Sequence, residues 1–561
     1  MVRALGLRLR RMRDGLGVLA LVAAGVWGVS AATGAAGEAV LRAERFGLKA
    51  DGRSDDGPAI GRMLAASARA AGAVRLAFPA GKVVRVATAA GRYVFPLAGV
   101  SRLTVDGGGS TFLLAPGLRF LRLTGSRCVT FRRLRIDFDP LPFADGLVTG
   151  VDARGRCLDV RAAPWVRALP VGGPTKADGE QAFFAMLWHR GPYGLLSRHY
   201  GTKRMVRGAD PNTVRVFADD GFRAFGDVEP GRWRISLPVP GIAHRYGPGG
   251  CLDVFDNDTV TFEDVELWSA PWFGFRVMRC SGEVTFRRVH VRPKPGSGRL
   301  TSTWRDGFHV KGNSARLLWD NCVLRGMNDD ALNLSTHTSR VKKRLSPKEI
   351  VVLQTFPLSP MPWHAGAVLA AADFNTRTLL GTAGIVRVTG SGKARRIGGK
   401  PAAGPVTLTL DRPIEGLPVG AMVWQPQSSN PRTTLRRCRI EQSCRLQTPV
   451  TLEACDVTAL LWFYGEKVEG PFPSGVVVRD CTVRRGRGNP RLAVSFAGRT
   501  VRNARPSAIH DVVFERNRVW GDFSMVGVDR VRLAGNEFRE PGAAVRIDNC
   551  RDVKRTGTGA P

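Results

Sequence analysis

The chain has 561 residues, and its 83 lysines and arginines against 48 aspartates and glutamates give a formal net charge of +35 at pH 7. This length can bury a large core, and the 66 glycines suit a fold with many tight turns. The basic residues are dispersed, without a basic run interleaved with aromatic residues, so we predict no nucleic-acid partner. A basic surface also attracts acidic lipids and acidic polysaccharides, and the sequence leaves open whether the charge selects an anionic substrate.

The first 31 residues have the pattern of an export signal. Five arginines between Arg3 and Arg13 precede an apolar stretch from Gly15 to Val29, and Val29-Ser30-Ala31 is a small-residue cleavage site. We therefore expect a signal peptide over residues 1–31, a secreted or periplasmic protein, and no membrane contact after cleavage. An uncleaved anchor is the alternative, because the apolar character continues toward Ala36 and approaches the ~20 residues that span a bilayer.

The following sequence begins with a turn and an Ala-rich helical segment. Pro58 to about Ala71 has the composition of a helix, and Asp56 or Gly57 precedes it as the cap. We expect this helix to cover the open edge of the first coil of a repeat structure, since an exposed strand edge invites aggregation. The segment is similar to the N-terminal cap of pectin-degrading β-helix enzymes, and we assign residues 40–144 to the cap and the first coils.

Three short segments have nearly the same sequence. They are Val129-Thr130-Phe131-Arg132-Arg133-Leu134, Val260-Thr261-Phe262-Glu263-Asp264-Val265 and Val284-Thr285-Phe286-Arg287-Arg288-Val289, and the last two start 24 residues apart. Each is a short strand with period-2 alternation, and no such strand buries its apolar face alone. Stacked coils do bury it, so we predict an all-β protein whose fold is a right-handed parallel β-helix of the pectin-lyase-like type.

Two stretches interrupt this repeat. Residues 145–248 and 339–420 contain short apolar runs between Gly- and Pro-rich links, which predicts two small antiparallel β domains inserted into solenoid loops, the second of them barrel-like. We expect central coils with the active site over residues 249–338 and C-terminal coils over residues 421–552. Residues 553–561 form a tail.

The central coils contain three acids that the repeat brings together. Asp306 and Asp330 are 24 residues apart, about one coil, and Asp329 precedes Asp330. In this register Asn333 lies over His309, and neighbouring coils are about 4.8 Å apart. Three carboxylates this close cannot all ionise cheaply, so one proton is retained. A protonated acid beside ionised carboxylates is what glycoside hydrolysis requires, and these three acids are the candidate catalytic groups.

Strict alternation would point Asp306 and Asp330 into the core, where an unpaired carboxylate is costly. We therefore expect a turn or a bulge just after each of these residues that turns the side chain outward. The alternative interpretation is that they are solvated turn residues, since Asp is common in turns. Three acids in register, flanked by His309 and Asn333, favour a site.

Four cysteines, Cys322, Cys438, Cys455 and Cys481, occupy one position of the repeat. Other residue types in the same position are found at Asn517, Asn536, Val265, Val289 and Leu134. A position shared by these types predicts an inward stacking slot at a corner of the coil, where cysteine behaves as a small apolar residue. We expect these four cysteines to be buried and mostly reduced, and some disulfides elsewhere remain open.

Four motifs carry a family resemblance. They are Phe138-Asp139-Pro140-Leu141-Pro142-Phe143, Arg292-Pro293-Lys294-Pro295-Gly296-Ser297, Asp306-Gly307-Phe308-His309 and Gly326-Met327-Asn328-Asp329-Asp330-Ala331-Leu332-Asn333. Together they resemble glycoside hydrolase family 110, whose members are inverting, exo-acting α-1,3-galactosidases built on a β-helix with inserted β-barrels. The layout of the acids is also similar, more distantly, to the inverting polygalacturonases of family 28.

The resemblance implies roles for the three acids. Asp329 would be the general acid, while Asp306 and Asp330 would hold and deprotonate the attacking water. The register agrees, because Asp306 and Asp330 stack as a pair and Asp329 has the opposite parity. An inverting site separates its acid from its base by roughly 6.5–9.5 Å to admit water.

The chain also departs from both families. After Asn333 the galactosidases usually continue Val-His-Gly, whereas this chain has Leu334-Ser335-Thr336-His337, so that His337 supplies an imidazole two residues later. The departure bears on galactose specificity more than on hydrolysis. The Gly-His-Gly and Arg-Ile-Lys segments that follow the acids in polygalacturonases have no counterpart in this sequence.

We expect His309 and Asn333 to line the sugar pocket beside the acids. A later segment, Leu461-Trp462-Phe463-Tyr464-Gly465-Glu466, looks like a Trp-aromatic-acid element of the galactosidase family. Further candidates for substrate binding are Arg276, His337, Glu466, Trp272, Trp304 and Trp462, the tryptophans because aromatic faces stack on sugars. Each of them, taken singly, is equally well an ordinary surface or core residue.

The sequence therefore predicts an exported, inverting glycoside hydrolase that cleaves terminal α-linked galactose from a glycan or polysaccharide. We expect no cofactor and no metal, since no His or Cys spacing resembles a metal site. The alternatives are a polygalacturonase-like hydrolase, a β-helix polysaccharide lyase and a non-catalytic glycan binder. A lyase would want a Ca²⁺ cage of several acids and an Arg or Lys base. The oligomeric state is left open.

Overall fold

A computed structural model of the protein describes residues 37–172, 185–219, 227–240, 249–355, 362–390, 395–397, 400–402, 404–487 and 491–557. Residues 1–37 and residues 38–561 fall into two units, and the second unit is described below. The signal peptide expected over residues 1–31 lies outside the described residues. Within them, no helix has the length and the apolar composition needed to cross a membrane.

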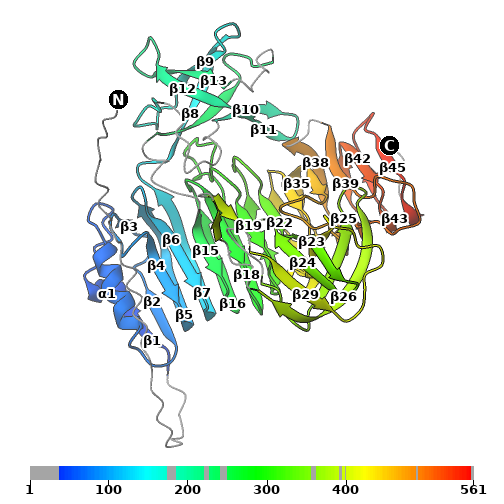
Figure 1. Cartoon of the computed structure of the whole chain (residues 1–561). Coiled ribbons are helices and arrows are strands. Elements are labelled where there is room, and N and C mark those ends of the chain that lie inside the picture. Colours follow the sequence, from blue (N-terminus) through cyan, green and yellow to red (C-terminus); the bar gives the residue numbers. More distant parts are fainter. Residues whose placement is uncertain are drawn as a thin grey trace, which may run out of the picture. The chain divides into compact units, whose positions relative to one another are not determined.

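Parallel strands build most of the second unit (Figure 1). In the described residues, twenty strands pair in one parallel sheet, here the corner sheet, and eleven pair in a second, here the site sheet. Val260 pairs with Val129 in the coil before it and with Val284 in the coil after it, as the repeat predicted. The predicted fold, a right-handed parallel β-helix, is confirmed.

The strands of the corner sheet are β1 (Ala39–Arg42), β2 (Val74–Ala77), β3 (Val83–Val86), β5 (Ser101–Leu114), β7 (Arg127–Phe138), β16 (Thr259–Leu267), β18 (Glu283–Val291), β20 (Arg316–Asp320), β21 (Val323–Leu324), β31 (Arg432–Arg436), β32 (Arg439–Ile440), β34 (Val450–Glu453), β35 (Asp456–Ala459), β37 (Val476–Arg479), β38 (Thr482–Arg487), β40 (His510–Glu515), β41 (Arg518–Trp520), β43 (Asp529–Ala534), β44 (Glu537–Phe538) and β46 (Arg551–Thr556). Those of the site sheet are β4 (Tyr93–Ala98), β6 (Arg119–Thr124), β15 (Gly250–Phe255), β17 (Phe273–Met278), β19 (Phe308–Lys311), β22 (Leu332–Ser335), β33 (Cys444–Leu446), β36 (Leu461–Phe463), β39 (Leu492–Ala497), β42 (Asp522–Val526) and β45 (Val545–Asp548).

The corners of the coils explain the position that four cysteines share. The residue before this position has a left-handed backbone, with φ of +54° at Asp264 and +56° at Asp480. The chain turns there, and the next side chain points inward. Cys322, Cys438, Cys455 and Cys481 are all buried, as predicted, and the structure places none of them in a disulfide. Asn517 occupies the same inward position in a later coil, and its side-chain amide donates a hydrogen bond to Val478 O at 2.9 Å.

Aromatic rings stack along the inside of the coils and fill the core. The rings of Phe131 and Phe262 lie 5.4 Å apart and nearly parallel, and Phe286 continues the stack at 5.4 Å from Phe262. Trp319 follows at 5.0 Å from Phe286. Each coil places the same type of side chain at the same inward position, so equivalent side chains of neighbouring coils stack on one another. This stacking fixes the register between coils.

The N-terminal helix α1 (Gly57–Ser67) buries Ile60 and Met63 in the core. It begins at Gly57, one residue before the predicted start, and ends at Ser67, before Ala71, since the chain turns there to enter β2 at Val74. The Asp56 carboxylate does not cap the helix and accepts hydrogen bonds from the backbone of residues 49 and 50 at 2.7 and 3.0 Å. Short 3₁₀ helices are η1 (Ala43–Phe46) and η3 (Pro426–Ser428).

Two antiparallel elements interrupt the coils. The first is a sheet of β8 (Phe143–Asp152), β9 (Cys157–Ala162), β10 (Ala185–Gly191), β11 (Gly194–Tyr200), β12 (Thr202–Arg207), β13 (Thr213–Ala218) and β14 (Arg234–Pro238). The second is a closed barrel of β23 (Ser339–Ser346), β24 (Glu349–Gln354), β25 (Val368–Asp373), β26 (Thr378–Thr389), β29 (Val406–Leu410) and β30 (Met422–Trp424), with a hairpin of β27 (Arg395–Ile397) and β28 (Lys400–Ala402). At the C-terminus, strand β46 pairs with β43, so residues 553–556 of the expected tail belong to the last coil.

Candidate active site

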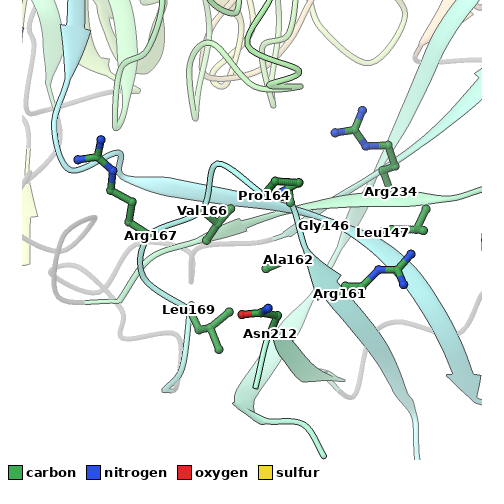
Figure 2. Close-up of a pocket in the computed structure, with 11 residues that line it drawn as sticks. Gly146, Leu147, Arg161, Ala162, Pro164, Val166, Arg167, Leu169, Asn212 and Arg234 are labelled. Atoms are coloured by element: carbon green, nitrogen blue, oxygen red, sulfur yellow. The ribbon is translucent and has the colours of Figure 1, made fainter. Parts of the chain in front are cut away.

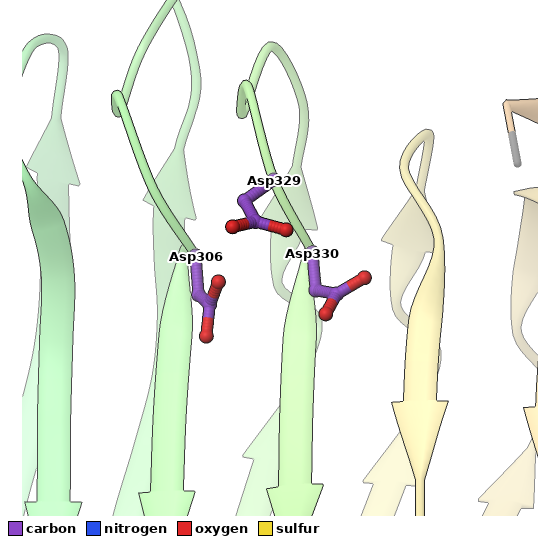
Figure 3. Close-up of side chains that lie close together, drawn as sticks. All are labelled: Asp306, Asp329 and Asp330. Atoms are coloured by element: carbon purple, nitrogen blue, oxygen red, sulfur yellow. The ribbon is translucent and has the colours of Figure 1, made fainter. Parts of the chain in front are cut away.

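The three acids precede two neighbouring strands of the site sheet. In the pairing of β19 with β22, His309 is opposite Asn333, as the 24-residue offset predicted. Asp306 and Asp330 lie two residues before these strands, and Gly307 N donates to Asp330 O at 2.9 Å. Figure 3 shows Asp306 and Asp330 on adjacent coils, with the Asp329 carboxylate lying between the two strands.

A bend follows each of the two stacked acids, at Gly307 and at Ala331. At Gly307 the reason is a close approach between coils, because a Cβ there would lie 2.7 Å from Met327 Cε and 2.9 Å from Ala331 O. Only glycine fits, so the Asp-Gly pair reflects packing between coils and is not a solvated turn.

The three carboxylates are close and differ in burial. One oxygen of each lies within 4.8 Å of one oxygen of the other two. The side chains of Asp306 and Asp330 are 3% and 11% exposed, whereas that of Asp329 is 24% exposed. Asp329 is therefore the acid that a bound molecule reaches most easily, and the other two form a buried pair behind it.

His309 is the partner of Asp306, with Nδ1 2.7 Å from Asp306 Oδ2. Burial, and then the positive charge of Lys311, lowers the pKa of His309 well below its ordinary value. Burial, and then the negative charges of Asp329 and Glu469, raises the pKa of Asp306 well above its ordinary value. Both shifts disfavour the charged forms, and therefore the ion pair, across this contact.

Asp330 is held by Ser443 and Arg445. The Ser443 hydroxyl donates to Asp330 Oδ1 at 2.9 Å, and Arg445 Nε lies 3.2 Å from Asp330 Oδ2. Burial and the charge of Asp329 raise the pKa of Asp330 to about 8, against the opposing effect of Arg445. Asp329 itself pairs with Arg305 Nη1 at 3.1 Å. Asp330 thus retains a proton near neutrality.

A second layer of charge lies beneath His309 and Asn333, and it centres on Lys311. Lys311 Nζ donates to Asn333 Oδ1 at 2.8 Å and to the Ser335 hydroxyl, and it pairs with Glu469 Oε1 at 3.2 Å. Glu469 Oε2 accepts from Asn333 Nδ2 at 3.2 Å and from Arg445 Nη1 at 3.1 Å. The positive charges around Glu469 lower its pKa although burial opposes this. Glu469 is therefore an ionised carboxylate that holds Lys311, Asn333 and Arg445 in place.

The sequence did not single out Lys311, Ser443, Arg445 or Glu469. Arg445 pairs with Asn333 across strands, so its place follows from the register of β22 with β33. Lys311 comes two residues after His309. Residues two apart in a strand point to the same face, so the sequence could have placed Lys311 beside His309. Glu469 lies 136 residues from Asn333 in the chain and reaches the site from the loop after β36, which no local pattern indicates.

Two tryptophans expected to stack on sugar are buried in a different environment. Trp272 and Trp304 form an apolar cluster with Phe143 of the inserted sheet, and the rings of Trp304 and Phe143 stack at 6.1 Å. Arg305 lies over the Trp272 ring at 4.9 Å. The expectation of exposed aromatic faces is wrong for both residues, because the antiparallel sheet covers them.

The other predicted pocket residues differ in accessibility. Arg276 is in register with His309 and forms two 2.7 Å hydrogen bonds with Asp253. Glu466 Oε2 accepts from Arg445 Nη1 at 3.2 Å, on the outer side of the Glu469 layer. Trp462 is 38% exposed and available to a ligand. His337 is buried in the link between β22 and β23.

The inserted antiparallel sheet is joined to the acid-bearing turn through Asn328. The Thr301 hydroxyl lies 3.1 Å from Asn328 Oδ1 and 2.9 Å from the Ser236 hydroxyl of β14. Ser236 donates to Asp145 at 2.5 Å, and His199 Nε2 lies 3.1 Å from Asn328 O. The turn that carries Asp329 is therefore positioned by residues from two elements.

A hollow of about 570 Å³ lies within this inserted sheet (Figure 2). Among the described residues, its lining includes Arg161, Arg167, Arg234 and Asn212 and no carboxylate. None of the three clustered acids contributes to it, so this hollow is separate from the candidate active site.

The three acids are also a set that could hold a cation. Within the described residues they are the cluster of His, Cys, Asp and Glu side chains close enough for that role. Arg305, Arg445 and His309 already take oxygens of the same carboxylates. A divalent cation would have to displace these contacts, so the residues present fit proton transfer better than they fit an oxygen cage.

Comparisons with known proteins place the chain near sugar-active proteins. No family model matches the sequence. The chain is 23% identical over 270 residues to alpha-1,3-galactosidase B of Bacteroides thetaiotaomicron, covering 45% of this chain and 41% of that protein. It is 23% identical over 325 residues to alpha-1,3-galactosidase A of Shewanella woodyi, covering 53% of this chain and 51% of that protein. The chain therefore spans about half, or less, of the length of these relatives.

Solved structures are similar over most of the chain but at low identity. The A-module of the mannuronan C-5 epimerase AlgE4 from Azotobacter vinelandii covers 92% of this chain at 11% identity, with a TM-score of 0.32.

Proposed function

We propose that the protein is a glycoside hydrolase that removes terminal α-linked galactose from a glycan, as an α-1,3-galactosidase does, and that it inverts the anomeric centre. The observation that supports hydrolysis most is the cluster of three carboxylates within 4.8 Å, one accessible and two buried, which retains a proton near neutral pH. This is the arrangement of acid and base that glycoside hydrolysis needs. The names of the relatives support galactose as the sugar.

The proposed reaction assigns one role to each side of the cluster. Asp329, the most accessible acid, gives its proton to the glycosidic oxygen as the bond from that oxygen to the anomeric carbon breaks. A water attacks the same carbon from the opposite face and passes a proton to Asp306 or Asp330. The reacting state therefore needs Asp329 protonated and at least one of these two carboxyls ionised, which the coupled cluster reaches by moving the proton that Asp330 otherwise retains. One water is consumed, and the proton count of the three carboxyls is restored.

Inversion rests on the family resemblance and not on the spacing. The nearest carboxylate oxygens lie within 4.8 Å, whereas acid and base of inverting glycosidases are usually about 6.5–9.5 Å apart. The buried pair Asp306 and Asp330 offers a place for the water beside Asp329. The stereochemistry of the product decides between inversion and retention.

The test is hydrolysis of a panel of α-linked galactosides and uronides followed by proton NMR. We expect galactose as the released sugar, with the β-anomer appearing first from an α-galactoside. First appearance of the α-anomer would replace inversion by retention, and release of no sugar from any member would overturn the proposed hydrolysis. We also propose that the protein is exported, and mass analysis of its N-terminus in a secreting host tests this.

The second candidate is a β-helix polysaccharide lyase. It is favoured by the acid cluster, which could hold a cation, and by Lys311, whose pKa is lowered by burial as a lyase base requires. Lys311 is fully buried, which keeps it from a sugar and favours the hydrolase. Unsaturated products absorbing in the ultraviolet from a uronate polymer, lost in chelator and restored by Ca²⁺, would reverse the assignment.

A further inference from the structure

A hollow of about 330 Å³ lies along the site sheet on the C-terminal side of the acids. Its lining includes Ser495 of β39, Ser524 of β42 and Arg546 of β45, which are in register with one another. Toward the acids, the same row of outward positions continues through Trp462 and Arg445 to Asn333. With strands ~4.8 Å apart, Ser495 is roughly 14 Å from the Asn333 position. The hollow and the acids therefore lie on one face.

The barrel contributes Arg377 to the wall of this hollow, just before β26. Its Nη1 donates to Ala497 O at 2.9 Å, and the side chain is partly buried. Burial lowers the pKa of Arg377. Among the described residues no carboxylate lies within ion-pair distance of it. A partly buried cation without a counter-ion is unfavourable, and a bound anion would relieve that cost.

The other charges of the hollow leave it positive. Arg546 Nη2 donates to Asp548 Oδ2 at 3.0 Å, and Arg502 Nη2 lies 3.5 Å from Asp548 Oδ1. The fourth arginine of the lining, Arg499, is neutralised by a buried ion pair with Asp529. Arg377, Arg502 and Arg546 therefore face one carboxylate, and two positive charges remain in excess.

An aromatic platform lies between the acids and the hollow. Trp462 is accessible on the shared row, and its ring stacks on Tyr464 at 3.8 Å with an angle of 15°. A rigid, exposed aromatic face suits stacking on the apolar face of a sugar ring. The row therefore presents an acid site, an apolar platform and a basic hollow in that order.

We propose that the hollow binds an anionic substituent, a sulfate ester or a carboxylate, of the same glycan whose terminal sugar lies at the three acids. Guanidinium groups bind such oxyanions through paired hydrogen bonds, and Arg377 is the principal contact. The intervening sugar stacks on Trp462. The direction of the glycan rests on the proposed function, while the anion site rests on Arg377 and the lining of the hollow.

Titration calorimetry on the Asp329→Asn protein, in which turnover is suppressed, tests this at 0.15 M NaCl. The ligands are a neutral α-1,3-galactosyl oligosaccharide, its sulfated form and a uronate-bearing form. We expect one of the anionic forms to bind about tenfold more tightly than the neutral one, as a charge-assisted hydrogen bond predicts. Arg377→Gln should remove this difference without changing neutral binding, and the exposed Arg546→Gln should reduce it.

Arg122→Gln is the matched control. Arg122 is an exposed arginine on the same outward row of the site sheet, opposite Asp253 in the pairing of β6 with β15. It tests whether the large net charge alone produces the preference, since general electrostatic attraction would respond equally to either loss. Equal weakening by Arg122→Gln and Arg377→Gln, or equal affinity for all three saccharides, would overturn the proposal.

The proposed hydrolase function and the proposed anion site can each be disproved without the other. A protein that hydrolyses a neutral galactoside without any preference for anionic forms keeps its proposed function and loses this site. A protein that releases no sugar, yet binds anionic saccharides through Arg377, loses the hydrolase and keeps the site. Unchanged thermal midpoints of Arg377→Gln and Arg546→Gln establish that either loss of binding is local.

Discussion

Charged side chains lie on the outside of the coils in two arrangements. At the corners of the corner sheet they form exposed pairs, of which Arg516 with Asp480 is representative, with two hydrogen bonds of 2.7 and 3.0 Å. Beside β19 and β22 they form the site cluster, which comprises the three acids with His309, Lys311, Arg445 and Glu469. The pairs at the corners are open to water, whereas Lys311 and Asp306 in the cluster are buried.

This difference shows which charges the fold requires. An exposed pair contributes ~0–1 kcal/mol and is easily replaced during sequence change. A buried charge must be matched by partners or it destabilises the protein by several kcal/mol. The corner position of other coils holds alanine, as at Ala454, so the coil does not need a charge there. The burial of Asp306 and Asp330 and their raised pKa values destabilise the folded protein, and a role in catalysis explains this cost better than a role in stability does.

The largest effect is expected from the acids of the cluster. Asp329→Asn removes the proton donor to the leaving group, so kcat/KM on a natural glycoside should fall about 10²–10⁴-fold. The loss should be far smaller on a dinitrophenyl galactoside, whose leaving group departs without a proton. Asp306→Asn and Asp330→Asn should be poor on both substrates, because the water still needs its base.

Steady-state kinetics of the three variants on both substrates also test the alternative assignment. Rescue of Asp330→Asn or Asp306→Asn, rather than Asp329→Asn, by the activated substrate would exchange the roles of acid and base. Near-wild-type activity of all three would place the chemistry outside the cluster.

The repeat in the sequence was sufficient for the fold and for the register at the site. Val129, Val260 and Val284 begin segments of nearly the same sequence. These segments pair as neighbouring parallel strands with equivalent residues opposite one another. The same 24-residue offset placed Asp306 beside Asp330 and His309 beside Asn333. In a β-helix, residues one coil length apart in the sequence lie side by side on neighbouring coils. The sequence repeat is therefore enough to predict these positions.

What the sequence could not supply comes from chain segments outside the coils. Glu469 reaches Lys311 from a loop whose path depends on tertiary packing. Trp272 and Trp304 are covered by Phe143, which belongs to an antiparallel sheet whose docking no repeat encodes. The assignment of Trp304 to a sugar pocket failed for that reason, since aromatic composition does not distinguish a covered face from an open one.

The second largest effect is expected from breaking the charge balance beneath the acids. Glu469→Gln leaves Lys311 buried without its carboxylate, so the free energy of unfolding should fall by about 3–5 kcal/mol. Combining it with Lys311→Met should restore part of this loss. Urea unfolding of the single and double variants measures both. Glu466→Gln is the control, because this partly exposed carboxylate touches Arg445 and not Lys311; an equal loss there would remove the distinction between the two glutamates.

The third effect is a pH dependence of opposite sign at Asp330 and at Asp320, a buried carboxylate of the corner sheet. In the folded protein Asp330 has a pKa of about 8, so from about pH 5 to pH 8 it keeps a proton that the unfolded chain has released. Stability therefore decreases as pH rises through this window, with a slope of about 1.4 kcal/mol per pH unit for one proton. Asp330→Asn should reduce that slope when urea midpoints are followed from pH 5 to pH 8.

Asp320 on the corner sheet provides the contrast. Arg436 donates to it and, despite burial, lowers its pKa. Its stabilising effect is present above the ordinary carboxyl pKa and is lost only in more acidic solution, as pH falls through the lowered pKa. Asp320→Asn should therefore lower the midpoint about equally at pH 5 and pH 8. A wild-type slope that survives Asp330→Asn unchanged would assign the retained proton to another group.

The smallest effect is expected at the corners. Arg516→Ala removes both hydrogen bonds to Asp480, yet both side chains are exposed, so the free energy of unfolding should fall by only about 0.2–1 kcal/mol. Alanine is compatible with the left-handed backbone there, since Ala454 has φ of +51° and Arg516 has +52° at equivalent corners. The double-mutant cycle with Asp480→Ala isolates the pair, and its coupling energy should shrink further in 1 M NaCl because salt screens exposed charges. A loss as large as that of Glu469→Gln would mean that corner pairs hold the coils together, and burial would then no longer separate the charges of the fold from those of the site.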